Sequence, residues 1–138
     1  MKPHDPILLI EDDDVDAMTV RRALKDLGAS HPLDWVTNGE EGLAFLRNPA
    51  NVRPGLILLD LNMPRMNGFE FVAEMKADPA LKAIPVVVLT TSKEEADRVA
   101  SFSHSVAGYM IKPVDYRQFV EVMRTIRDYW MISEPAAS

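Results

Sequence analysis

The chain has 138 residues and no cysteine, which favours one domain with its own core and excludes a disulfide scaffold, a thiolate metal site and a cysteine nucleophile. A net charge of −6, from 15 basic and 21 acidic residues, disfavours nonspecific binding to a phosphate backbone. The apolar runs are far shorter than the ~20 residues of a membrane span, and the N-terminus lacks an apolar signal core. We therefore expect a cytoplasmic domain with neither a nucleic acid nor a membrane as a direct partner.

Short apolar runs, separated by longer amphipathic stretches, predict strands that alternate with helices. The runs are Ile7–Ile10, Leu33–Val36, Leu56–Leu59, Val86–Leu89 and Gly108–Ile111. Continuous apolar runs are typical of strands that are buried on both faces of a sheet. Alternation of this kind predicts a parallel sheet with helices on both sides, and right-handed crossovers leave few topologies. We expect a doubly wound, flavodoxin-like (βα)5 fold with strand order 2-1-3-4-5.

Local signals mark the ends of several predicted helices. The first helix is expected to stop at Gly28. The segments Asn38–Glu41 and Ser92–Glu95 have the spacing of capping boxes and predict two helix starts. The helix after the fourth run has a thin apolar face, so it should open at little cost and suits a switch element.

Polar side chains stand where the predicted strands end. Glu11 and Asp12 follow the first run, and Asp60 follows the third. Thr90 and Lys112 follow the fourth and fifth runs. Ligands of open α/β sheets bind beyond this edge, so these residues should converge. Carboxylates about 5 Å apart repel by ~3 kcal/mol at an effective dielectric of 20, and a divalent cation relieves this repulsion. Oxygen ligands of this kind suit Mg²⁺.

Each of these polar residues also has an ordinary structural interpretation. Acidic residues are favourable at a helix N-terminus because of the helix dipole, and this is the interpretation that we favour for Asp13, Asp14 and Asp16. Lys112 alone fits a solvated loop residue equally well, and Thr90 alone fits a turn. The combination of residues, rather than any one of them, indicates a site.

With these motifs assembled, the chain resembles the receiver domain of two-component response regulators. The matching segments are Ile7–Asp12, Leu58–Pro64, Val88–Ser92 and Gly108–Pro113. The similarity covers residues 5–130, which leaves 131–138 as a short C-terminal tail. The segment Phe119–Trp130 and the overall length are also similar to single-domain regulators that pair with phytochrome-type histidine kinases.

The resemblance implies a phosphorylation site with a bound metal. It implies that Asp60 accepts a phosphoryl group from a histidine of a partner kinase. It further implies that Asp12 and Asp60 bind Mg²⁺ directly, that the main-chain carbonyl of Asn62 is a third ligand, and that Glu11 binds the ion through water. The chain would then be a signalling phosphoacceptor that catalyses only its own phosphorylation and dephosphorylation, rather than a metabolic enzyme.

The resemblance also implies roles for residues around the phosphoryl group. Thr90 and Lys112 are expected to contact phosphoryl oxygens, and Tyr109 is expected to move inward together with Thr90. A cis peptide bond is expected between Lys112 and Pro113. Thr91 is larger than the residue often found at its position, so it should restrict access to the phosphoryl group and slow its hydrolysis. This arrangement meets the needs of phosphoryl transfer, which are alignment and positive charge at the equatorial oxygens.

The sequence points less directly to the output of the domain than to its phosphorylation site. The fifth strand–helix unit is followed only by a short tail, so we expect output through protein contacts, phosphate relay or competition for the kinase. The surface around residues 92–112 and the last helix is expected to change on phosphorylation. Four apolar residues at the end of the last helix cannot all face one side of it: Tyr129, Trp130, Met131 and Ile132. They leave open both packing within the domain and a homodimer contact.

Other function classes fit the sequence less well. A phosphorylation-independent, receiver-like binding scaffold remains as the alternative. A Mg²⁺-dependent phosphatase of the haloacid dehalogenase type needs a second carboxylate two residues after the nucleophile, and Asn62 stands there. A flavodoxin-type carrier needs a phosphate loop after the first strand, where this chain has acidic residues.

Overall fold

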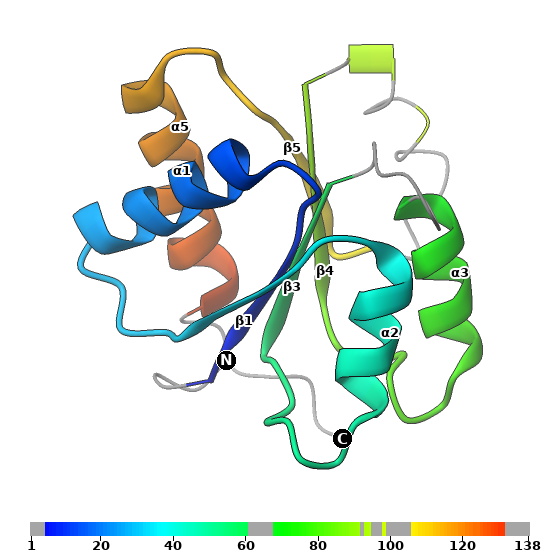
Figure 1. Ribbon diagram of the computed structural model, residues 1–138. Coiled ribbons are helices and arrows are strands. Elements are labelled where there is room, and N and C mark those ends of the chain that lie inside the picture. The colour runs from blue at the N-terminus through cyan, green and yellow to red at the C-terminus, as the bar shows by residue number, and fades with distance from the viewer. Residues whose placement is uncertain (1–4, 61–67, 92, 95–97, 99–105, 132–138) are drawn as a thin grey trace.

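The computed structural model describes residues 5–60, 68–91, 93–94, 98 and 106–131. Within this part of the chain, five parallel strands form one sheet in the order β2-β1-β3-β4-β5 (Figure 1). The strands are β1 (Ile7–Ile10), β2 (Leu33–Val36), β3 (Leu56–Asp60), β4 (Val86–Thr90) and β5 (Gly108–Ile111). The predicted strand positions and order are confirmed, and β3 and β4 each extend one residue further than expected.

Helices cover both faces of the sheet (Figure 1). The helices α1 (Asp14–Asp26) and α5 (Tyr116–Ile126) lie on one face, and α2 (Gly39–Arg47) and α3 (Gly68–Ala77) lie on the other. The predicted switch helix after β4, with its capping box at Ser92–Glu95, falls largely outside the described residues. No helix in the described ranges is long and apolar enough to cross a membrane.

The core has two layers because β1 and β3 are apolar on both faces. Alternate side chains of a strand point to opposite faces. Ile7 and Leu9 therefore pack with the α1 and α5 side chains, while Leu8 and Ile10 pack with those of α2 and α3. All four are at most 1% exposed. This burial on both faces fixes the central strands, and so fixes where their carboxyl ends lie.

Side-chain caps set the helix starts. The Asp13 carboxylate caps α1 by accepting hydrogen bonds from the amides of Val15 and Asp16. Asn38 caps α2 by accepting from the Glu41 amide at 2.9 Å. The Glu41 carboxylate accepts from the amide of Thr37, so the reciprocal bond of the predicted capping box is shifted by one residue. As predicted, α1 ends just before a glycine: Gly28 has a φ of +69°.

The last helix changes form near its end. After Ile126 the chain continues as one π-helical turn over Arg127–Met131. The Arg127 guanidinium donates a hydrogen bond to the Leu27 carbonyl, which ties this turn to the end of α1. Tyr129 is 66% exposed. The rest of the predicted dimer contact, namely the side chains of Trp130 and Met131 and the whole of Ile132, lies outside the described part.

Candidate functional site

The strand register brings the predicted site residues to one edge of the sheet. Asp60, at the end of β3, pairs with Leu89 of β4, and Thr90, at the end of β4, pairs with Ile111 of β5. The Lys112 amide, one residue further, donates a hydrogen bond to the Thr90 carbonyl at 2.7 Å. Parallel strands in this register therefore end side by side and present their next side chains to the same region.

Three carboxylates converge at this edge. One oxygen each from Glu11, Asp12 and Asp60 lies within 4.8 Å of the other two. Glu11 is 2% exposed, whereas Asp12 is open to solvent and Asp60 is partly buried. A cluster of hard oxygen donors with one solvent-facing member is the ligand set that Mg²⁺ or Mn²⁺ prefers. The residues present therefore fit the divalent cation expected from the sequence.

The Glu11 carboxyl group is poised between two states. Its burial, assisted by a hydrogen bond to Asp60, raises the pKa of Glu11 to about 8, although the Lys112 ammonium opposes this shift. Without a cation, Glu11 thus keeps its proton near neutral pH. A divalent cation favours the ionised form, so metal binding and proton release are coupled at this residue.

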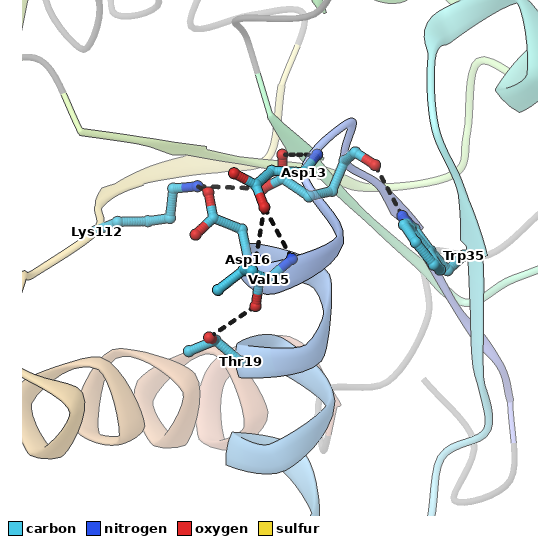
Figure 2. Close-up of polar contacts among 7 residues, drawn as sticks. Asp13, Val15, Asp16, Thr19, Trp35 and Lys112 are labelled. Carbon is cyan, nitrogen blue, oxygen red and sulfur yellow. Dashed lines mark hydrogen bonds and ion pairs between the residues drawn. The ribbon is translucent and has the colours of Figure 1, made fainter.

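Lys112 supplies a largely shielded positive charge beside the carboxylates. Its Nζ lies 3.2 Å from Glu11 Oε1 and 3.6 Å from Asp16 Oδ2 (Figure 2). The side chain is only 12% exposed. Burial by itself lowers the pKa of Lys112, but the charges of Glu11, Asp60 and Asp16 together raise it. The ammonium therefore stays charged at neutral pH.

The remaining predicted site residues differ in their exposure to solvent. Thr90 is 1% exposed at the end of β4, and Tyr109 on the edge strand β5 is 41% exposed and so faces outward in this structure. Thr91 is exposed, and its effect on hydrolysis stays a prediction. Asn62 lies outside the described residues.

The expectation of a cis bond at Lys112–Pro113 is wrong for this structure. No cis peptide bond occurs in the described residues, which include both members of this pair. Trans is the more stable form of an X–Pro bond by ~0.5–1 kcal/mol in the absence of other constraints.

Two residues that the sequence did not point to also contact the site. The Trp35 indole donates a hydrogen bond from Nε1 to the main-chain carbonyl of Glu11 at 2.7 Å (Figure 2). The Glu11 amide donates to the Val36 carbonyl at 3.0 Å, so β2 holds the Glu11 backbone from both sides. Asp16, which we had assigned only to the helix start, pairs with Lys112.

Comparison with known proteins agrees with this geometry. The family model of the response regulator receiver domain matches residues 7–124. Response regulator Rcp1 of Synechocystis sp. is 39% identical over 141 residues, which span 98% of this chain and 96% of that protein.

Solved structures lead to the same family. The phosphorylated cyanobacterial phytochrome response regulator RcpA matches with 38% identity and a TM-score of 0.86, over 97% of this chain and 99% of that one. The Mn²⁺-bound form of Rcp1 matches with 37% identity and a TM-score of 0.84, over the same shares. A sheet edge that gathers three carboxylates and a lysine thus occurs in a chain whose whole fold is shared with these proteins, and the chain belongs to the response regulators of two-component signalling.

Proposed function

We propose that Asp60 is the phosphoacceptor of this response regulator and that a histidine kinase is the donor. The convergence of Glu11, Asp12 and Asp60 beside the Lys112 ammonium supports this proposal. Asp60 is the member of the cluster that ends a central strand and stands between the other two carboxylates and Thr90. Asp12, Asp60 and the Asn62 carbonyl would bind Mg²⁺ directly, and Glu11 would bind it through water. The Mn²⁺-bound form of the relative Rcp1 supports a divalent ion in this family.

The chain's own groups fit a transfer between histidine and aspartate. An Asp60 carboxylate oxygen forms a bond to phosphorus while the bond from phosphorus to the histidine nitrogen breaks, and the electron pair returns to the imidazole. Lys112 and the Thr90 hydroxyl would neutralise and hold phosphoryl oxygens. Mg²⁺, when bound, adds positive charge at the same oxygens. The domain would catalyse both the gain and the loss of this group by these contacts.

Phosphorylation with a small donor tests the proposal. The wild-type chain, incubated with acetyl phosphate and Mg²⁺, is expected to gain one phosphoryl group by intact mass, and Asp60→Asn is expected to gain none. Asp14→Asn, which changes an exposed acid in the first turn of α1, is the matched control and should react like the wild type within a factor of about two. An unmodified wild type, or an adduct that survives in Asp60→Asn, would contradict the assignment and favour a phosphorylation-independent scaffold.

We further propose that the kinase docks beside Lys112, over the start of α1. A kinase must bring its histidine into contact with Asp60 and so must cover this edge of the sheet. Val15 and Met18 on α1 are 69% and 58% exposed, and Val114 in the loop after β5 is fully exposed. Val15 and Met18 line a pocket of about 320 Å³. Val114 lines a second pocket of about 480 Å³, which shares Thr19 and Arg22 with the first. The lining of the second pocket also includes Asp16, Thr91, Lys112 and Tyr116.

Replacing Met18 with glutamate is expected to reduce transfer from the kinase by about tenfold or more, because it places a charge in an apolar contact. Phosphorylation by acetyl phosphate should be unchanged, since Met18 does not belong to the acidic cluster. Val52→Glu is the control: Val52 is also 69% exposed but lies before β3, near the other end of the sheet. Equal losses with both donors would argue against this docking site.

Several finer assignments complete the proposal. A phytochrome-type kinase is the partner that the similarity to the phytochrome response regulator RcpA supports. The receiver domain would span residues 5–130 in a bacterial cytoplasm, with 131–138 as a tail. A homodimer through the C-terminal helix is supported by the exposure of Tyr129 in the π-helical turn after α5, and a chain that ends at Asp128 should then sediment as a monomer.

A further inference from the structure

Two carboxylates from different segments compete for the Lys112 ammonium. Glu11, a buried residue directly after β1, lies 3.2 Å from Nζ. Asp16, in the first turn of α1, lies 3.6 Å from Nζ and is half-exposed. Figure 2 shows the Lys112 and Asp16 side chains pointing toward one another. An ammonium has three donors, so each carboxylate occupies one direction in which Lys112 could otherwise face a phosphoryl oxygen.

The position of Asp16 is fixed by the helix start. The Asp13 side chain, which caps α1, accepts a hydrogen bond from the Asp16 amide at 3.3 Å. The backbone of Asp16 is therefore tied to the segment that directly follows the acidic pair. A partly exposed ion pair of this kind contributes little to stability. Its main effect is instead on where the Lys112 charge is held.

We propose that Asp16 is a positioning residue that holds Lys112 on the α1 side of the site and competes with the phosphoryl group for the lysine charge. Asp16 then slows the phosphorylation of Asp60, because Lys112 must weaken this ion pair when it turns to the incoming phosphoryl oxygens. The proposal rests on the function proposed above, in which Asp60 is the phosphoacceptor. Asp16 is among the carboxylates that raise the pKa of Lys112, which agrees with such a contact.

Two matched variants separate the contact from general charge effects. Asp16→Asn and Asp14→Asn each remove one negative charge from the first turn of α1, but of these two residues Asp16 is the one that pairs with Lys112. Asp16→Asn should raise the initial rate of phosphorylation by acetyl phosphate about two- to fivefold above that of Asp14→Asn, which is the range that an exposed ion pair spans. In a Lys112→Met background the two asparagine variants should react at equal rates.

A second measurement does not depend on phosphorylation or on metal. In the metal-free protein at one neutral pH, the NMR signals of the Lys112 side chain should shift in Asp16→Asn relative to both the wild type and Asp14→Asn. Thermal unfolding of each variant checks that the fold is intact. Loss of the ion pair without loss of the fold should change these signals and leave the unfolding temperature unchanged.

The outcomes separate this proposal from the one on which it rests. Equal rates for the two asparagine variants would overturn the role of Asp16 alone. A slower Asp16→Asn would also overturn it, since Asp16 would then orient Lys112 for the reaction rather than hold it back. A wild type that gains no phosphoryl group would instead refute the assignment of Asp60.

Discussion

Replacing Lys112 with methionine is expected to slow the phosphorylation of Asp60 by acetyl phosphate about 100-fold or more, while the protein stays folded. A preorganised donor in a site shielded from water contributes this much when it faces charge that develops in the transition state. Lys112 fits that description, because its side chain is 12% exposed and its ammonium lies 3.2 Å from the buried Glu11 carboxyl group.

The fold should survive this change because Glu11 can stay neutral. The loss of a partner normally leaves a buried charge uncompensated, which is strongly destabilising. Here the pKa of Glu11 is already raised to about 8, and the loss of the Lys112 charge raises it further, so Glu11 remains protonated at neutral pH. Methionine also keeps the unbranched, apolar part of the lysine side chain.

The measurement is the initial rate by intact mass, together with a thermal melt. Lys25→Met serves as the control, because Lys25 is an exposed lysine in the last turn of α1, at the end of the helix that faces away from the site. A Lys112→Met rate within about threefold of the wild type would mean that Lys112 does not act on the phosphoryl group.

The metal-free protein is expected to lose stability as the pH rises from about 5 to about 8. The pKa of Glu11 is about 8 in the folded chain and 4.5 in its ordinary state, so between these values the folded chain binds a proton that the unfolded chain has released. Stability falls with pH wherever the folded state binds more protons. Over the whole interval this single group contributes a decrease of a few kcal/mol at most.

Glu11→Gln should remove this slope, because the amide keeps a hydrogen-bonding group in place but cannot ionise. Saturating Mg²⁺ should reduce the slope in the wild type, since a cation stabilises the ionised cluster. The free energy of unfolding, measured by urea at several pH values with a chelator present, provides the test. Glu40→Gln, a change at an exposed acid in the first turn of α2, should keep the wild-type slope. A flat profile in the metal-free wild type would show that Glu11 is ionised throughout.

The sheet could be predicted from the sequence because its central strands are buried on both faces. Such strands appear as unbroken apolar runs, and Leu56–Leu59 and Val86–Leu89 were recognised in this way. Each of these apolar runs ends one residue before the strand does, because backbone pairing continues through the polar residues Asp60 and Thr90. A run of apolar residues predicts which side chains are buried, but it does not predict the residue at which the backbone pairing of the strand ends.

The site could be predicted in part for the same reason. The carboxyl ends of parallel strands lie at one edge of the sheet. Glu11, Asp60 and Lys112 could therefore be predicted to lie close together from their positions at the ends of predicted strands. Asp16 was missed because an acid at a helix start has a sufficient local explanation in the helix dipole. The role of Trp35 depends on a contact between residues 24 positions apart on neighbouring segments, which no local pattern encodes.

The hydrogen bond from Trp35 to the Glu11 carbonyl gives the protein a built-in optical probe. Indole emission responds to the hydrogen bond at Nε1, and this bond ends on the peptide that joins the two acidic residues. The chain contains two tryptophans, so Trp130→Phe leaves Trp35 as its single fluorophore. Any event that shifts the Glu11–Asp12 peptide could then be followed in real time by fluorescence, without a label.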